Sequence, residues 1–544
     1  IYPENDDIGW GGIYFENTNE ARSDTSVINY CKFVKGVAKS NSLWHPDHQK
    51  NDLGGSIYCN NSSLIIQNSF FMDNYADQSG GAIAVLDMSS VLIRNCIFKN
   101  NKADNQGGVI SLEYSNLNVY NSKFLNNESL FTSAGAIWIE ESNANIYDSE
   151  FKGNVANSQG GAISSRYGNL ILKRNDFRYN EAVTGGAILL EYETDTIIDS
   201  TNIENNLAEN TGGGLFLHET EINISNSSIA YNVANSLDGG GIYIGKSCNI
   251  NIDSTYINNN HANHYGGALF IEKGDFAEIG PTVTIERSTL YNNSAVDAAS
   301  SIYLDSSTLN FVSSINWNNS IFSQADIIVN GDYSINAFYS DIQGASGESW
   351  FGTDCIDTDP MFWNPPVNFD LKWMGYPMPD LGKSPCIDTG SPDSVNDPDG
   401  TRADMGVNYY HQEWTNLAPG NISGYLDNQA SPYYVDGDLL VPAGEELTIE
   451  SGSSIIFKGS YVFEVRGRLI ADAGTSPYKI NIIAQDTVSG FKGLRFYNTN
   501  TNQQDSSRVI NTRISYGRVD QSLNYGKGGE IGRASCRERV CVGV

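Results

Sequence analysis

Glutamates recur at one position of a regular pattern in this chain, and paired carboxyl groups are what most glycoside-cleaving enzymes use. Hydrolysis of a sugar bond needs two carboxyl groups about 5–10 Å apart. Neighbouring copies of a stacked repeat could provide that spacing for Glu191 and Glu219. Counted from the second glycine of each repeated Gly-Gly pair, the fifth position holds Glu113, Glu140, Glu191 and Glu272, and in one copy His218, which Glu219 follows.

The repetition itself favours a solvated edge over an active centre, because a catalytic site is usually a break in a repeat. No Lys, Arg or Tyr cluster visibly accompanies these acids in the sequence. The chain also contains no Gly-x-Ser-x-Gly, HExxH or phosphate-loop motif. Glu191, His218 and Glu219 are therefore only weak catalytic candidates.

The third position after the same glycine is apolar or aromatic in five consecutive copies. It lies between two positions that are expected to be buried, so its side chain should point outward. Such an exposed stripe, about 20 Å long over five coils, is typical of an interaction surface. Alternatively, the irregular region 346–412 folds back over it. The stripe consists of Leu189, Phe216, Tyr243, Phe270 and Tyr303.

The acidic loop Asp397, Asp399 and Asp404 carries oxygen ligands of the kind that Ca²⁺ prefers. The spacing does not match an EF-hand, because position 395 is Val. The simpler interpretation is a turn in which Asp side chains bond the backbone and Arg402. Calcium is thus a weak alternative, and the sequence predicts no other cofactor or metal.

Histidine and cysteine add little chemistry. His261 and His264 lie three residues apart, but on an expected turn. The cysteines have no CxxC spacing, which disfavours zinc. Cys355 and Cys386 flank one irregular segment and could form a disulfide.

Composition narrows the class of partner. The 544-residue chain has a formal net charge of -31, which disfavours nucleic acid and anionic membranes. No apolar run reaches the ~18 residues that a membrane-spanning helix needs. A carbohydrate or a protein surface remains the expected ligand.

A repeat of 25 to 27 residues must position all of these side chains. Its second glycines are residues 55, 81, 108, 135, 161, 186, 213, 240 and 267. Apolar residues at the second and fourth positions after the glycine predict one strand. Two further short strands follow, and the last of them carries the aromatic residue of a Phe-x-x-Asn unit such as Phe98 to Asn101. Three short strands with no room for a helix predict an all-β fold, a right-handed parallel β-helix. The Gly-Gly and Asn columns are expected to be structural.

The paired Gly-Gly-Ala-[Ile/Leu/Val] and Phe-x-x-Asn motifs resemble the polymorphic outer membrane protein repeats of Chlamydia-type autotransporters over residues 11–305. The resemblance implies a surface-exposed passenger β-helix, and in that family the repeats are associated with adhesion. The chain departs from the family in lacking a C-terminal barrel. Residues 359–406 are similar to the closing segment of many secreted bacterial β-helix proteins, through Asp359-Pro360, Ser384 to Gly390 and Asp397 to Gly406.

These patterns predict five regions. Residues 1–345 should form a β-helix of about eleven coils, 346–412 an irregular closing segment, 413–422 a linker and 423–529 a second, smaller β-helix. Residues 530–544 resemble a translated sequencing adapter and are set aside. Because residue 1 is Ile and the repeat is already under way at Gly11-Gly12, the N-terminus is expected to be truncated. The adapter-like end predicts the same for the C-terminus.

The leading functional hypothesis is a non-catalytic, extracellular or cell-surface adhesin-like protein that binds glycans or other surfaces through one outer face. The first alternative is a carbohydrate-active enzyme, a polysaccharide lyase or glycoside hydrolase, centred on Glu191, His218 and Glu219. The second is a structural stalk that spaces another domain.

Overall fold

The computed structural model of the chain describes residues 1, 9–18, 25–39, 52–193, 195–274, 280–319, 326–373, 382–412, 414–428, 430–476, 479–486, 489–497, 507–518 and 531–533. It contains strands and turns and, in these residues, no helix. The chain divides into two compact units, residues 1–397 with 402–410 and residues 398–401 with 411–544.

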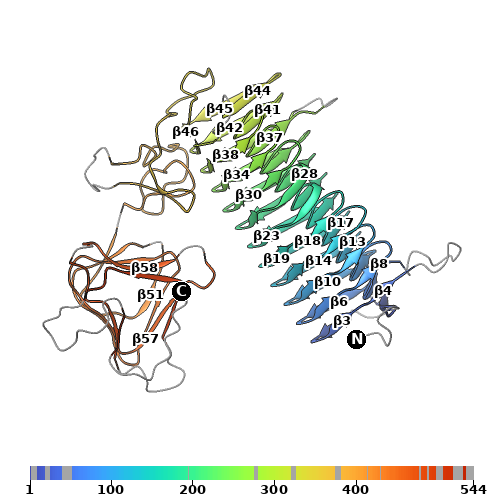
Figure 1. Cartoon of the computed structure of the whole chain (residues 1–544), viewed down its shortest axis with the longest axis horizontal. Helices are drawn as coiled ribbons and strands as arrows, with labels where there is room; N and C mark the ends of the chain where they lie inside the picture. The colour runs from blue at the N-terminus through green and yellow to red at the C-terminus, as the bar shows by residue number, and fades with distance from the viewer. Residues whose placement is uncertain are drawn as a thin grey trace. The chain divides into compact units, whose positions relative to one another are not determined.

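The first unit is a parallel β-solenoid, in which successive strands of each sheet come from successive coils (Figure 1). The first sheet consists of β1 (Ile13–Glu16), β5 (Ile57–Asn60), β9 (Ile83–Leu86), β13 (Ile110–Glu113), β17 (Ile137–Glu140), β21 (Ile163–Arg166), β25 (Ile188–Glu191), β29 (Leu215–His218), β33 (Ile242–Ile244), β37 (Leu269–Glu272), β41 (Ile302–Asp305) and β44 (Ile327–Asn330).

The second sheet follows the first across a corner. It consists of β2 (Ser26–Asn29), β6 (Ser63–Gln67), β10 (Ser90–Arg94), β14 (Asn116–Tyr120), β18 (Asn143–Tyr147), β22 (Asn169–Lys173), β26 (Thr196–Asp199), β30 (Glu221–Ser225), β34 (Asn249–Asp253), β38 (Thr282–Glu286), β42 (Thr308–Val312) and β45 (Ser334–Phe338).

The third sheet carries the aromatic residue of the Phe-x-x-Asn unit. It consists of β3 (Lys32–Val34), β7 (Phe70–Met72), β11 (Ile97–Lys99), β15 (Lys123–Leu125), β19 (Glu150–Lys152), β23 (Asp176–Arg178), β27 (Asn202–Glu204), β31 (Ser228–Ala230), β35 (Tyr256–Asn258), β39 (Thr289–Tyr291), β43 (Ile315–Trp317) and β46 (Asp341–Ile342).

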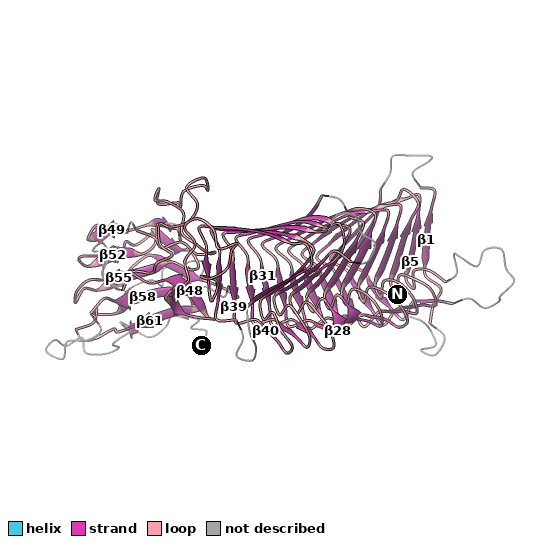
Figure 2. Cartoon of the chain, turned by 90° about the horizontal axis from the view of Figure 1, so that it is seen from above, coloured by secondary structure: helices cyan, strands magenta, loops and turns pink. Residues whose placement is uncertain are grey.

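A fourth sheet of very short strands was not expected. It consists of β4 (Val37–Ala38), β8 (Tyr75–Ala76), β12 (Lys102–Ala103), β16 (Glu128–Ser129), β20 (Val155–Ala156), β24 (Glu181–Thr184), β28 (Leu207–Thr211), β32 (Val233–Ala234), β36 (His261–Ala262) and β40 (Ser294–Ala295). Most of these strands are only two residues long, and two residues are too few for an alternating pattern to be recognised in the sequence. Figure 2 shows the sheets of this unit from above.

Burial follows the predicted alternation. Apolar side chains of the first, second and third sheets point inward and form one continuous core. Six phenylalanines stack along the third sheet with ring centroids 4.5 to 4.9 Å apart, from Phe33 to Phe177. That separation equals the ~4.8 Å distance between neighbouring strands, so each coil adds one ring to the stack. In the described residues three sheets have twelve strands each, slightly more than the eleven coils predicted.

The asparagine column is a buried amide ladder, as expected. Asn127 Nδ2 donates to Asn154 Oδ1 at 2.9 Å, and Asn154 Nδ2 donates to Asn180 Oδ1 at 3.0 Å. The same Oδ1 atoms accept the backbone N–H of the preceding coil's asparagine, for example Asn127 N at 3.1 Å from Asn154 Oδ1. The Nδ2 groups of Asn127 and Asn154 also donate to the carbonyl oxygens of Phe98 and Phe124, so these amides can be buried at little cost.

The Gly-Gly pairs are required by close approach of the backbone. Gly80 has φ 68°, and a Cβ on it would lie 2.3 Å from the carbonyl oxygen of Ile83. A Cβ on Gly81 would lie 2.2 Å from the carbonyl oxygen of Gly108 in the next coil. A Cβ at either position would lie too close to the backbone, which explains why glycine recurs at both, although Ala134 and Ala299 take the first position in two coils with φ 62° and 54°.

The closing segment packs on the outer face of the third sheet. Its hairpin, β47 (Phe362–Asn364) and β48 (Asn368–Leu371), is antiparallel. Phe362, Phe369, Leu371, Ile387 and Met405 form a small core with Ile315.

The second unit is also a parallel β-solenoid, with a core of its own. Its first sheet consists of β49 (Thr415–Leu417), β52 (Tyr433–Val435), β55 (Ser454–Phe457), β58 (Ile480–Ala484) and β61 (Thr512–Ser515). The second consists of β50 (Gly420–Asn421), β53 (Leu439–Val441), β56 (Phe463–Val465), β59 (Leu494–Phe496) and β62 (Ile531–Arg533). The third consists of β51 (Gly424–Leu426), β54 (Glu446–Ile449), β57 (Arg468–Asp472) and β60 (Arg508–Ile510).

One predicted boundary needs correction in this unit. Residues 413–422 are not a linker, because β49 and β50 form the first strands of the second solenoid and pair with β52 and β53. The region 530–544 was set aside, yet β62 pairs in parallel with β59. Residues 534–544 lie outside the described residues. The linker prediction was wrong because a two- or three-residue strand is too short to show alternation in the sequence.

Candidate functional site at the first corner

The site lies where the chain turns from the first sheet into the second. At this corner the residue after the first-sheet strand takes a left-handed backbone conformation, with φ 56° at Tyr167, 57° at Tyr192 and 49° at Glu219. The sharp turn directs these side chains outward. Tyr167 is 51 % exposed and Tyr192 is 37 % exposed. We call this region, comprising Arg166, Tyr167, Glu191, Tyr192, His218, Glu219 and Lys246, the first-corner cluster.

Parallel register brings the last residues of three strands side by side. Arg166 in β21 pairs with Glu191 in β25, which pairs with His218 in β29. The guanidinium Nε of Arg166 lies 2.7 Å from Glu191 Oε2. Arg166 also donates to Gln159 Oε1 at 2.8 Å and lies over the ring of Trp138, 5.4 Å from its centroid. The Arg166 cation is therefore fixed from several sides.

A second ion pair flanks the first. Lys246 Nζ lies 2.7 Å from Glu219 Oε1, and this bond raises the pKa of Lys246 above its usual value. Burial, and then the charge of Glu219, raise the pKa of Tyr192, which keeps its phenol protonated. Both candidate carboxylates are thus bound by a cation.

The aromatic rings of the cluster form a short ladder. Tyr167 and Tyr192 stack with centroids 4.7 Å apart and an interplanar angle of 5°, and His218 meets Tyr192 edge-on at 5.9 Å and 88°. Stacking covers the facing sides of the two phenol rings, so the ladder offers solvent mainly ring edges and hydroxyl groups. A Cβ on Gly245 would lie 3.1 Å from His218 Cδ2, so the glycine leaves room for the imidazole.

Chemically, the cluster is a hydrogen-bonding surface with two neutralised charge pairs. His218 Nδ1 is buried and has no hydrogen-bond partner among the described residues. Glu191, His218 and Glu219 do come together, as their spacing suggested. The expectation that no Lys, Arg or Tyr accompanies them was wrong, because Arg166 and Lys246 join from neighbouring coils and Tyr192 directly follows Glu191. Reading the sixth position after each glycine as a column would have revealed Tyr167, Tyr192 and Lys246.

The aromatic stripe is not an open surface. Leu189 is 0 % exposed and Phe270 is 6 % exposed. The cause is the Gly-Gly turn that ends the preceding coil. A Cβ on Gly185 would lie 3.2 Å from the Leu189 Cβ, and one on Gly212 would lie 3.1 Å from the Phe216 Cβ. Leu189 and Phe270 are therefore buried beneath the turn, whereas Phe216, Tyr243 and Tyr303 keep part of their surface exposed.

The rings of the stripe nevertheless stack, with centroids 4.6 Å apart for Phe216 and Tyr243 and 4.9 Å apart for Phe270 and Tyr303. The Tyr243 hydroxyl donates to Glu272. The closing segment, which we considered as the cover of the stripe, packs instead on Tyr256, Tyr291 and Trp317 of the third sheet.

The carboxylate oxygens of the acidic loop accept hydrogen bonds from nearby backbone N–H groups. Asp404 accepts the N–H groups of Asp388 at 2.6 Å and Tyr410 at 2.6 Å, and burial raises its pKa to about 8. Asp397 accepts the N–H of Asp404 at 3.0 Å. Asp399 accepts both Thr401 N at 3.0 Å and Gln412 N at 2.8 Å. The Asp-to-backbone bonds fit the turn interpretation, but Arg402 donates to the carbonyl oxygen of Gly390 at 2.6 Å rather than to an aspartate. In the part of the chain that the structure describes, no group of three His, Cys, Asp or Glu residues is arranged to hold a metal.

Cys355 and Cys386 do not form a disulfide, since both are free thiols. Cys386 is buried and its Sγ lies 3.3 Å from Asp341 Oδ2, to which it donates. Burial raises the pKa of Cys386 well above its usual value, and that of Asp341 to about 7. The protonated thiol is therefore a structural hydrogen-bond donor.

The fold defines the class of the protein: a right-handed parallel β-helix with repeats of the surface-protein type. Residues 107–279 match the family model described as "Right handed beta helix region". Residues 95–113 match the Chlamydia polymorphic membrane protein repeat. The predicted fold class and the predicted resemblance are thereby confirmed. Together the β-helix and this repeat indicate a surface-type protein.

Among solved structures, the chain is similar to one titled "Crystal structure of pectate lyase Pel9A", at 11% identity and a TM-score of 0.37, covering 72% of this chain and 98% of that one. No curated protein matches the chain. Across the described residues, no helix has the length and apolar character that crossing a membrane requires.

Proposed function

We propose that this protein is a non-catalytic, adhesin-like binding protein of the cell exterior, and that it binds glycans through the first-corner cluster. The observation that carries the proposal is the exposed Tyr167–Tyr192 ladder between two ion pairs. Phenol hydroxyls, a histidine and charged side chains held by neighbours form a preorganised polar surface, and such a surface needs little ordering when it binds a hydroxyl-rich ligand. The surface-type repeat is consistent with this role.

The ion pairs favour binding over catalysis. A glycosidase needs one carboxyl group that can give up a proton and a second that can act as base or nucleophile. Here Arg166 forms an ion pair with Glu191, and Lys246 forms one with Glu219, each with a nitrogen–oxygen distance of 2.7 Å. Because each acid is already engaged, neither presents the isolated carboxyl group that proton donation to a leaving sugar requires.

The test uses a glycan array followed by calorimetry with the glycans that bind. The double variant Tyr167→Ser/Tyr192→Ser should lose at least about tenfold in affinity, because both hydroxyl-bearing rings are removed. Its melting temperature should stay close to that of the parent, since both side chains are on the surface. Tyr231→Ser is the matched control, because Tyr231 is a similarly exposed tyrosine (46 % exposed) at another corner. Equal losses in the two proteins would show that the cluster is not the site, and no bound glycan would count against the proposal as a whole.

A carbohydrate-active enzyme is the second candidate, and the convergence of Glu191, His218 and Glu219 with Tyr192 is the observation that favours it. The measurement is release of reducing ends, or of unsaturated ends for a lyase, from a panel of neutral and acidic polysaccharides. Activity that Glu191→Gln abolishes while leaving glycan binding intact would replace the binding proposal with this one.

A further inference from the structure

The outer face of the second sheet carries a column of uncharged polar side chains in its last five strands. These strands, β30, β34, β38, β42 and β45, follow one another along the solenoid (Figure 1). Register aligns the middle outward side chain of each strand with that of the next. All five side chains are exposed or half-buried. We call this set the neutral column: Asn223, Asn251, Thr284, Asn310 and Asn336.

The adjacent outward column, on the side of the first corner, has the same character. It begins with Glu221 in β30 and continues with Asn249, Thr282, Thr308 and Ser334. Glu221, at the margin, is the one charged residue in the two columns of these five strands. A ligand that lies on them therefore meets hydrogen-bonding groups and almost no charge.

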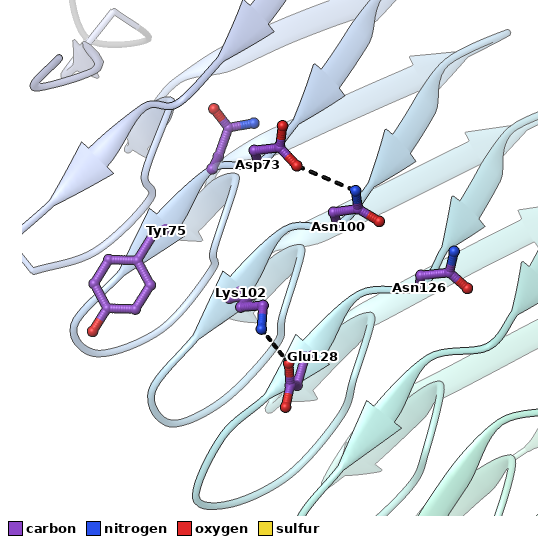
Figure 3. A pocket seen from close by; sticks show the side chains of 7 residues that line it. Asp73, Tyr75, Asn100, Lys102, Asn126 and Glu128 are labelled. Carbon is purple, nitrogen blue, oxygen red and sulfur yellow. Dashed lines mark hydrogen bonds and ion pairs between the residues drawn. The ribbon is translucent and has the colours of Figure 1, made fainter. Parts of the chain in front are cut away.

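Polar ladders elsewhere on the solenoid do include charges. Figure 3 shows one of them, in a hollow of about 510 Å³ at the corner between the third and fourth sheets. Asn100 donates there to Asp73 at 3.2 Å. In the same hollow Lys102 pairs with Glu128 at 2.6 Å. Stacked coils thus accept charged ladders as readily as neutral ones, so the neutrality of the neutral column belongs to its own five strands and not to the fold.

Hydrogen bonds between coils fix the side chains of the neutral column. Asn336 Nδ2 donates to Asn310 Oδ1 at 2.9 Å, and Asn310 Nδ2 donates to Thr284 Oγ1 at 3.1 Å. Asn251 Nδ2 donates to Asn223 Oδ1 at 3.4 Å. An amide group has two N–H donors and two oxygen lone pairs, so each of these amides keeps further hydrogen-bonding capacity for a ligand. Because the groups are already held in place, little ordering is needed when a ligand binds.

The spacing of the column favours one class of ligand. Neighbouring coils are ~4.8 Å apart, and an extended β-1,4-linked glycan advances by a similar distance with each sugar. Such a chain can lie along the solenoid axis with one sugar on each coil. An extended peptide rises only ~3.3 Å per residue and would fall out of step with the coils.

Charge and size argue against other partners. The column has no cation that could bind an anionic ligand such as a nucleic acid. Its five strands span roughly 19 Å, and a strip of this length and two side chains in width is far smaller than the ~800 Å² per partner of a stable protein interface. An uncharged, narrow and extended ligand fits both limits.

We propose that the neutral column binds an uncharged, extended polysaccharide of the β-1,4-linked type, with one sugar on each of five coils. The sugar hydroxyls donate to the oxygens of the column and accept from its amide N–H groups. This inference does not rest on the first-corner cluster, because the two sites share no residue.

The test uses the full chain with the substitutions Tyr167→Ser and Tyr192→Ser, so that the first-corner ladder does not contribute to the binding that is measured. Calorimetry follows the binding of β-1,4-linked glucose and N-acetylglucosamine oligosaccharides of two to six sugars. Affinity for at least one series should rise with each sugar up to five and then level off, because five strands carry the column. Salt should leave it unchanged, since no charges are paired. Maltohexaose, whose α-1,4-linked chain coils, is the control ligand and should bind more weakly.

A substitution in the column should weaken this binding. In the same background, Asn310→Leu should lower the affinity for the six-sugar ligand at least about tenfold, because it removes the amide that joins two coils. Asn145→Leu is the matched control. Asn145 lies at the same outward position of β18 and donates to Asn118 at 3.0 Å, but the next coil places Ile171 there. Thr284→Val, which removes a hydroxyl and keeps the shape, should also weaken binding and serves if Asn310→Leu folds poorly.

Three outcomes would overturn the proposal: neither oligosaccharide series binds, affinity does not depend on length, or Asn310→Leu and Thr284→Val bind as Asn145→Leu does. Each of them leaves the first-corner proposal standing, because that site has been altered in the protein under test. Conversely, glycan binding by the parent that disappears completely in the Tyr167→Ser/Tyr192→Ser protein would support the first-corner cluster and count against the neutral column.

Discussion

Replacement of Glu193 by glutamine should stabilise the protein above neutral pH. Glu193 is 1 % exposed and accepts a hydrogen bond from Ser165 Oγ at 2.7 Å. Elsewhere in this column serine hydroxyls accept the N–H of the preceding coil, as Ser142 Oγ does from Ser115 N at 2.9 Å. In the coil that follows Gly168, Glu193 takes the place of this serine, and its carboxyl group accepts the Gly168 N–H. A carboxyl group has therefore been placed inside the solenoid.

The magnitude follows from the pKa. Burial raises the pKa of Glu193 from 4.5 to about 7. Because the pKa is higher in the folded protein, the folded state binds the proton more tightly than the unfolded chain. This carboxyl group therefore costs nothing below about pH 4.5, and its cost grows as pH rises and is complete above about pH 7. At ~1.4 kcal/mol per pKa unit, the full cost is about 3 kcal/mol.

Glu193→Gln keeps the shape and the acceptor oxygen but cannot ionise. We expect its free energy of unfolding to exceed that of the parent by up to about 3 kcal/mol at pH 8, and to match it closely at pH 4.5. The assay is urea denaturation of both proteins at several pH values between 4.5 and 8. Glu221→Gln, which removes an exposed carboxylate on a nearby strand, is the control and should show no such pH dependence. A difference that is the same at pH 4.5 and pH 8, or a glutamine variant that is less stable at pH 8, would refute the reasoning.

Three other predictions concern the scaffold. Asn154→Ala should lower the free energy of unfolding by about 2–4 kcal/mol in denaturant titrations, because it leaves buried donors of Asn127 unpaired. Asn143→Ala, at an exposed position, is the control and should change it by less than about 1 kcal/mol. Gly81→Ala should prevent soluble expression or sharply lower the melting temperature, since its Cβ would lie 2.2 Å from the Gly108 oxygen, whereas Gly347→Ala, with open space around it, should be tolerated. Peptide mapping without reductant should recover Cys386 unlinked to Cys355, and alkylation should modify Cys386 only after denaturation, because its thiol is buried and free.

The repeated motifs were sufficient to predict the solenoid. Each motif makes a local demand that one coil cannot meet alone. Phe98 needs an identical neighbour for stacking, and Asn101 needs one for amide pairing. Position 81 must be glycine because the carbonyl oxygen of Gly108 in the next coil lies so close. Because neighbouring coils satisfy these demands in register, periodicity in the sequence translates directly into stacked parallel sheets. Strands of two or three residues, such as β8 and β49, were missed because they are too short to show alternation.

The candidate sites depended on contacts between coils that the sequence does not spell out. Glu191 and Glu219 were identified from their places in the repeat, but the register of the coils and the corner after them decided their partners. Arg166 pairs with Glu191, and Lys246 pairs with Glu219. Leu189 and Phe270 were expected on the surface, because alternation tells which way a side chain points and not what lies above it. The Gly-Gly turn lies there, and its position is set by the fourth sheet. The sequence by itself thus determined the coil and its core, whereas tertiary structure decided which outward residues are open to a ligand, because exposure depends on packing between segments far apart in the chain.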